Sequence, residues 1–158
     1  MTALTFPSAQ FPALPTISLD VPDDWQPIVV PGTILAVAAP EVPGVFRPNL
    51  VVSVTRFAAD YSLELAENAV VEKFASLEEA HQIGHDRTTL GDLEWAHIES
   101  TFLDPRVGTL VQAAHLAVVV HDGVADLIQI TGSVTGSQAK DGVIGTLRDV
   151  QRSATAHA

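Results

Sequence analysis

The sequence predicts one α+β domain built on an antiparallel sheet. Several segments between turn residues are typical of strands, and residues 16–21 alternate polar and apolar side chains with the period of two that half-buried strands show. Two segments, 62–76 and 137–150, instead repeat their apolar residues every three or four positions, as amphipathic helices do. Short turn sequences join consecutive strands, which favours antiparallel pairing over a doubly wound parallel sheet. Together these features predict about six to seven strands packed with two main helices.

The first half of the chain is expected to supply an arm and three strands. Residues 1–15 are rich in proline and follow neither period, so we expect an extended arm. This arm is either ordered by packing of Phe6 and Phe11 on the body or loose. Three strands are then expected where apolar or β-branched residues run between turn residues, over 16–21, 33–39 and 49–56.

A helix is expected to interrupt the strands at about 62–76. Ser62 is well placed as its N-cap, because a serine hydroxyl accepts a hydrogen bond from a free backbone N–H of the first turn. The apolar residues of this segment share one helical face, and they are Leu63, Ala66, Val70, Phe74 and Leu77. The opposite face carries Glu64, Glu67 and Glu72, which are expected to point outward into solvent.

The second half is expected to form a run of strands and a closing helix. Strands are predicted over 83–90, 94–103, 109–120 and 124–131. Asp122-Gly123 is the strongest turn signal, because a type I′ hairpin turn needs two residues that tolerate positive φ. The second helix is expected from Ser137, as its N-cap, to Val150. We therefore place the domain at 16–152 and expect a frayed tail at 153–158.

The charge balance and the lack of cysteine exclude several classes of function. Nineteen acidic residues outweigh eight basic ones and leave a formal net charge of −11, whereas nucleic acids and anionic membranes are bound by basic surfaces. The absence of cysteine excludes thiol catalysis, thiolate zinc sites and iron–sulfur clusters. No apolar run is long enough to span a membrane. The first residues lack the regions of a secretory signal, so we expect a cytoplasmic protein.

Two segments carry a resemblance to a known fold family. Residues 17–25 read Ile-Ser-Leu-Asp-Val-Pro-Asp-Asp-Trp, and residues 46–52 read Phe-Arg-Pro-Asn-Leu-Val-Val. With the closing hairpin and terminal helix, they resemble the PsbP-like fold, which includes the Mog-type Ran-binding proteins. They are also similar to the LpqN-type lipoproteins of actinobacteria and to DcrB-related domains. The resemblance implies an α/β/α sandwich with a binding or accessory role, although the chain lacks the signal peptide and lipidation cysteine of the lipoproteins.

Two histidines are the best candidates for a polar site. If residues 104–108 form the loop of a hairpin, His97 lies directly opposite His115, and Glu99 shares their sheet face. Two imidazoles and a carboxylate could bind zinc or respond to pH. The alternative is ordinary packing with hydrogen-bonded histidines, because the rest of that face is apolar. No Gly-x-Ser-x-Gly elbow or Walker motif is present, so no catalytic residue and no cofactor are predicted.

The same hairpin suggests an interaction surface. Both of its faces are largely apolar, yet only two helices are expected to cover them, and exposed apolar patches of this kind often mark interfaces. The leading hypothesis is a non-catalytic binding or accessory module that contacts a protein partner, or itself, through an apolar sheet face. Its interface candidates are Trp95, Val111, Ala117 and Val119. The runner-up is a metal- or small-molecule-binding protein, conceivably an enzyme, centred on His97, Glu99 and His115.

Overall fold

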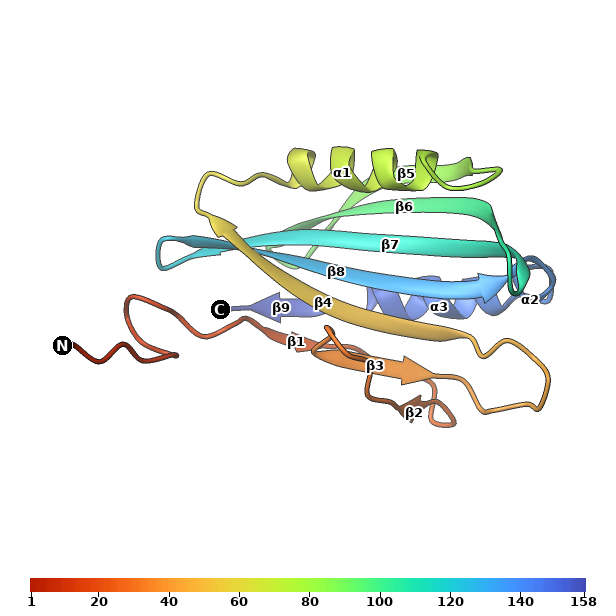
Figure 1. Cartoon of the computed structure of the whole chain (residues 1–158), viewed down its shortest axis with the longest axis horizontal. Coiled ribbons are helices and arrows are strands. Elements are labelled where there is room, and N and C mark those ends of the chain that lie inside the picture. Colours follow the sequence, from red (N-terminus) through yellow and green to blue (C-terminus); the bar gives the residue numbers. More distant parts are fainter.

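The computed structural model describes all 158 residues and contains two sheets and three helices (Figure 1). The strands are β1 Thr16–Ser18, β2 Gln26–Pro27, β3 Leu35–Ala38, β4 Asn49–Ala58, β5 His81–Leu90, β6 Leu93–Asp104, β7 Gly108–His121, β8 Val124–Thr135 and β9 Thr155–His157. Seven of them form an antiparallel sheet in the order β2-β3-β4-β8-β7-β6-β5, and β1 pairs with β9 in a second sheet. The predicted fold class is confirmed. None of the helices has the length and apolar character needed to cross a bilayer.

The first helix begins as predicted. Helix α1 spans Leu63–Ala75, and the backbone N–H of Leu65 donates to Oγ of its N-cap Ser62 at 3.3 Å. The second predicted helix is instead two helices, α2 Gly136–Lys140 and α3 Val143–Arg152. The break falls at Gly142, whose φ of +91° lies in the left-handed region that only glycine adopts readily.

The cap of α2 also differs from the prediction. Thr135, not Ser137, is the N-cap, and its side chain accepts from the backbone N–H of Gln138 at 3.2 Å. The Gln138 side chain in turn accepts from the backbone N–H of Thr135, which completes a capping box. The reciprocal pair satisfies two N–H groups, whereas Ser137 would satisfy one.

The long hairpins have the predicted pairing. Asp122 and Gly123 have φ of +46° and +83°, as a type I′ turn requires. Their flanking residues His121 and Val124 are direct partners. In the β6–β7 hairpin His97 lies opposite His115, so the predicted register is correct.

The helices cover both faces of the large sheet. Helix α1 packs on β5, β6 and β7, and α2 and α3 pack on β7 and β8 from the opposite side (Figure 1). The core under α3 contains Trp25, Val37, Leu50, Val52, Trp95, Val111, Ala117, Ile128, Ile130, Val134, Leu147, Val150 and Ala154. The core under α1 contains Ala66, Val70, Phe74, Ala96, Ile98, Phe102, Leu110, Ala114, Leu116 and Leu127. Successive residues of β6, β7 and β8 therefore point to opposite faces of the sheet and pack into different cores.

This arrangement overturns the expected interface on the sheet. Trp95 is only 1% exposed and Ala117 is fully buried, and Val111 belongs to the same buried core. Val119 is half-buried and packs against that core. These four side chains are covered by elements of their own chain, so they do not offer a free apolar face.

The two ends of the chain also differ from expectation. Residues 155–157 do not fray, because β9 pairs with β1 in register from Thr16 opposite His157 to Ser18 opposite Thr155. The ordered body therefore extends beyond residue 152. In the arm, Phe6 and Phe11 are exposed and belong to neither core, whereas Pro12 and Pro15 are buried.

Candidate functional site

The predicted histidine pair forms a polar cluster between the sheet and α3. The Nδ1 atoms of His97 and His115 lie 3.1 Å apart, and Nε2 of His97 lies 2.8 Å from Oε1 of Glu99. Sequence reasoning missed the fourth member, Arg148 of α3. Its Nε and Nη2 donate to the two oxygens of Glu99 at 2.6 and 2.7 Å. Only the packing of α3 on the sheet brings this guanidinium to the carboxylate.

Burial and hydrogen bonding set the charges in this cluster. Burial raises the pKa of Glu99, but hydrogen bonds from Arg148 and His97 outweigh it and lower the pKa to about 2. Burial lowers the pKa of His115 to about 3, with further contributions from the charges of His97 and Arg152. The cluster therefore contains an ionised carboxylate and, in β7, a neutral imidazole at ordinary pH.

This geometry does not fit the metal site considered from the sequence. Both oxygens of Glu99 already accept from Arg148, and a bound cation would face that guanidinium at close range. No group of three or more His, Cys, Asp or Glu side chains is arranged to hold a metal ion. Open hollows of about 510 and 460 Å³ lie elsewhere on the surface, and neither is lined by His97, Glu99 or His115. The cluster is therefore poorly placed for a metal or a small molecule.

His115 lies under α3 beside another buried polar side chain. Its ring stacks on Trp95, with centroids 4.7 Å apart and planes 9° from parallel. Gln151 of α3 reaches the same strands, because its Nε2 donates to the carbonyls of Ala113 at 2.8 Å and Ile130 at 3.0 Å. Nε2 of His115 and Oε1 of Gln151 have no hydrogen-bond partner, although both atoms are buried.

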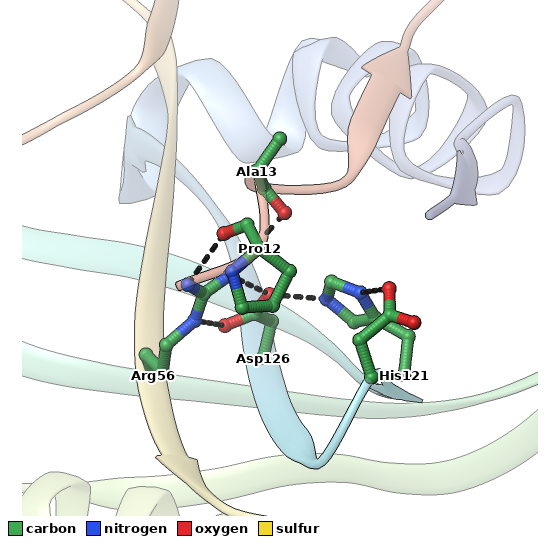
Figure 2. A network of polar contacts seen from close by, with 6 residues as sticks. Pro12, Ala13, Arg56, His121 and Asp126 are labelled. Carbon is green, nitrogen blue, oxygen red and sulfur yellow. Dashed lines mark hydrogen bonds and ion pairs between the residues drawn. The ribbon is translucent and has the colours of Figure 1, made fainter. Parts of the chain in front are cut away.

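A second cluster anchors the arm, and Figure 2 shows its contacts. Arg56 of β4 lies opposite Asp126 of β8 and donates to both of its carboxylate oxygens at 2.8 Å. The other edge of the guanidinium donates to the carbonyls of Pro12 at 2.6 Å and Ala13 at 3.3 Å. Nε2 of His121 lies 2.7 Å from Asp126. The fully buried carboxylate thus orients an arginine that holds the base of the arm.

The electrostatics of this second cluster resemble those of the first. Burial raises the pKa of Asp126, but hydrogen bonds from Arg56 and His121 outweigh it and bring the pKa below its ordinary value. The sequence contained one indication of this cluster, since Arg56 and Asp126 are oppositely charged residues within predicted strands. Their pairing depends on the register between β4 and β8, which are separated by more than sixty residues in the sequence.

A third cluster has the same composition on the other face of the sheet. Glu67 of α1 was expected to point outward, but it is buried, because it forms ion pairs with His85 and Arg87 of β5. Burial raises the pKa of Glu67, and hydrogen bonds from His85 and Arg87 outweigh this and lower it. In all three clusters a buried carboxylate is shared by one arginine and one histidine. Each cluster connects the large sheet to the element packed on it.

Beyond its anchor, the arm presents apolar side chains to solvent. Leu4 is 71% exposed and Phe6 is 60% exposed, and Met1, Phe11 and Leu14 are exposed as well. The first charged side chain in the sequence is Asp20. Figure 1 shows this segment extending away from the sheets. It is therefore a projection rich in apolar side chains and without charged ones, on a strongly acidic protein.

Comparison with known proteins identifies the fold. No protein-family model and no curated protein sequence matches the chain. Among solved structures, it is similar to LpqN, which is involved in cell envelope biogenesis of Mycobacterium tuberculosis, with TM-score 0.78, 16% identity, and coverage of 93% of this chain and 86% of LpqN.

Two further structures extend the likeness. Cyanobacterial PsbP from Synechocystis has TM-score 0.58, 14% identity and coverage of 99% of both chains. The Ran-binding protein Mog1p of Saccharomyces cerevisiae has TM-score 0.57, 16% identity, and coverage of 88% of this chain and 89% of Mog1p. The expected PsbP-like, Mog-type fold is confirmed.

Proposed function

From the PsbP-like fold and the site geometry, we propose that this chain is a non-catalytic accessory module that binds a protein through residues 1–14. The observation that carries the proposal is the exposure of large apolar side chains along an arm without charged side chains, while both faces of the sheet are covered. The contact surface is thereby moved from the sheet face, where the sequence suggested it, to the arm.

The composition of the arm supports a protein partner. Interface cores are enriched in aromatic residues and methionine and depleted of charge, and residues 1–14 share these properties. The arm begins from a fixed base, because Arg56 binds the carbonyls of Pro12 and Ala13. A segment ordered at one end loses less conformational entropy on binding than a free chain does.

The similar structures support an accessory role at the level of fold. Mog1p is a Ran-binding protein, and LpqN is involved in cell envelope biogenesis. Folds host unrelated functions, so neither role follows for this chain from the likeness alone. The cytoplasmic location expected from the sequence stays a prediction.

The first test is the solution mass by light scattering over a wide concentration range. Comparison of the parent with a Phe6→Ser, Phe11→Ser variant tests the arm, and Val29→Ser is a matched control because Val29 is 98% exposed outside it. If the partner is a second copy, the parent and control exceed one chain in mass and the arm variant does not. An arm variant that associates as the parent does would refute the arm as the contact. If the parent, the arm variant and the control all have the mass of one chain at every concentration, the partner is a different protein.

A further inference from the structure

The two edges of the large sheet differ in how well they are protected. One edge is β2, which has only two residues, Gln26 and Pro27. The other edge is β5, which has ten residues, contains neither proline nor lysine, and pairs with β6 alone. Natural sheets protect long edges with lysine, proline or bulges, because unpaired backbone groups attract another strand. The edge at β5 is therefore the one that is open to a further strand.

The last six residues of β5 keep the regular geometry that strand addition requires. A bulge interrupts the register between Gln82 and Gly84, but from His85 to Leu90 each residue has one partner on β6. All residues from His85 to Thr89 are exposed. The bulge thus protects only the beginning of the strand.

The turn after β5 determines which of its backbone groups point outward. Leu90 and Leu93 flank the two-residue loop Gly91-Asp92, in which Gly91 has φ of +62°. Residues that flank a two-residue hairpin loop bond to each other, and bonded and non-bonded pairs alternate along antiparallel strands. Bonding to β6 therefore falls on Leu90 and on every second residue before it. The N–H and C=O groups that point away from β6 are those of His85, Arg87 and Thr89.

Side chains of β5 point alternately to the two faces of the sheet. His85 and Arg87 lie on the α1 face, where both side chains contact the carboxylate of Glu67. Leu90 packs against the core under α3, on the opposite face. The α3 face therefore carries the alternate residues Asp86, Thr88 and Leu90.

An open hollow of about 510 Å³ borders the end of β5. Its apolar lining consists of Leu90, Leu93, Val119, Ala154 and Ala156, and the remainder of its lining is polar. A strand added beside β5 would place one side chain next to Leu90, at the border of this hollow. An apolar side chain at that position would bury surface against the apolar lining.

The charge around β5 indicates the kind of partner. Residues 78–94, which contain the strand and its turn, hold five acidic residues and one basic residue. The acidic ones are Glu78, Glu79, Asp86, Asp92 and Glu94, and the basic one is Arg87. Arg87 is already neutralised by ion pairs with Glu67 and Glu94, so an added strand would meet a negative field. A second copy would bring the same negative charge to the edge, whereas a cationic segment would complement it.

We propose that β5 accepts an extended, cationic segment of a partner protein as an eighth strand of the sheet. In antiparallel pairing this segment has an apolar residue opposite Leu90, a β-branched residue opposite Thr88 and a lysine or arginine opposite Asp86. Backbone hydrogen bonds to Thr89 and Arg87 hold it in register. This site lies at the sheet edge and does not involve the arm.

A six-residue peptide, acetyl-Val-Thr-Val-Thr-Lys-Thr-amide, tests the proposal in NMR titrations of the ¹⁵N-labelled full chain. We expect the amide signals of His85, Arg87 and Thr89 to shift and their hydrogen exchange to slow, because these N–H groups gain partners. Replacing the lysine of the peptide with glutamate should weaken binding about fivefold at low salt, since a like charge then lies beside Asp86. Amide signals that do not move at about 5 mM peptide, or a glutamate peptide that binds as tightly, would overturn the proposal.

Two variants at one position test the backbone pairing. Thr89→Pro removes an N–H that points outward, so β6 keeps its bonds while the added strand loses one. Thr89→Val keeps this N–H and is the matched control. We expect the proline variant to bind the peptide about fivefold more weakly than the parent, corresponding to one lost hydrogen bond, and the valine variant to bind as the parent does. Equal binding by the two variants would refute strand addition.

Modified peptides test the same bonds if Thr89→Pro does not fold. In the proposed register the N–H groups of the second and fourth peptide residues face β5, and those of the third and fifth face solvent. N-methylation at the second and fourth residues should abolish binding, whereas N-methylation at the third and fifth should not. Equal effects of the two modifications would refute the register.

Two further measurements distinguish this site from the arm and from self-association. The Phe6→Ser, Phe11→Ser variant should bind the peptide as the parent does, so failure of the arm as a contact leaves this proposal standing. A change in peptide affinity in that variant would refute a separate site. If light scattering shows a mass above one chain that Thr89→Pro reduces to one chain, the added strand comes from a second copy and the cationic partner is refuted.

Discussion

Replacing Arg148 with methionine should remove the main stabilisation of the buried Glu99 carboxylate. The pKa of Glu99 falls from an ordinary 4.5 to about 2 in the folded chain, a shift equivalent to roughly 3 kcal/mol, since one pKa unit is about 1.4 kcal/mol. Arg148 is 38% exposed, so solvent screens part of this interaction, and His97 still donates to the carboxylate. We therefore expect Arg148→Met to lower the free energy of unfolding by about 2 kcal/mol at pH 7.

The stability difference between the parent and Arg148→Met should depend on pH. A carboxyl group with a lowered folded pKa stabilises the protein above its unfolded pKa, and this contribution is lost as the pH falls towards the folded value. The difference between parent and Arg148→Met should therefore shrink from pH 4.5 downwards. Urea denaturation at pH 7, 5 and 3 measures it.

A matched control lies on the same helix. Arg152 is 65% exposed and 3.9 Å from Asp149, so Arg152→Met is expected to change the free energy of unfolding by less than about 0.5 kcal/mol. The reasoning is refuted if Arg148→Met matches this control at pH 7, or if its deficit is the same at all three pH values.

Three further predictions concern packing and the chain ends. Gly132→Ala places a Cβ 2.9 Å from Cδ1 of Leu147 and should lower the free energy of unfolding by about 1–3 kcal/mol. Gly145→Ala meets no atom within 4 Å and should stabilise α3 by up to about 1 kcal/mol. Thermal melts in which the Gly132 variant is the more stable of the two would contradict this. Arg56→Ala should release the arm and increase the rate at which a protease cleaves it. Arg106→Ala is the control, because the Arg106 side chain is 88% exposed, and it should leave that rate unchanged. Equal cleavage rates in the two variants would argue against the anchor. Deleting residues 153–158 removes β9, so the melting temperature and the protection of β1 amides from hydrogen exchange should both fall. If neither quantity changes, the pairing of β1 with β9 adds no stability.

Local interactions could be predicted from sequence because they depend on neighbouring residues. The Asp122-Gly123 turn determines which residues of β7 and β8 face each other, and the short loop after β6 does the same for His97 and His115. The cap at Ser62 is also local, since it requires one hydroxyl and the next turn of backbone.

Two of the errors lie in one short segment, residues 135–152. The second helix was predicted as continuous, although Gly142 breaks it with a positive φ. Its cap was assigned to Ser137, although Thr135 and Gln138 form a reciprocal pair. Helical periodicity continues across such a break, because the residues on either side still turn their apolar groups towards one core.

The sequence by itself determined the alternating strands, the tight turns and the antiparallel order, and with them the pairing of the two histidines. Only the tertiary structure decided that Arg148 and Gln151 of α3 lie above that pair, that Arg56 binds the arm, and that β9 closes on β1. The physical reason is distance along the chain. Turn geometry and residue period are properties of a few neighbouring residues, whereas these contacts depend on how whole elements pack to bury two cores at once.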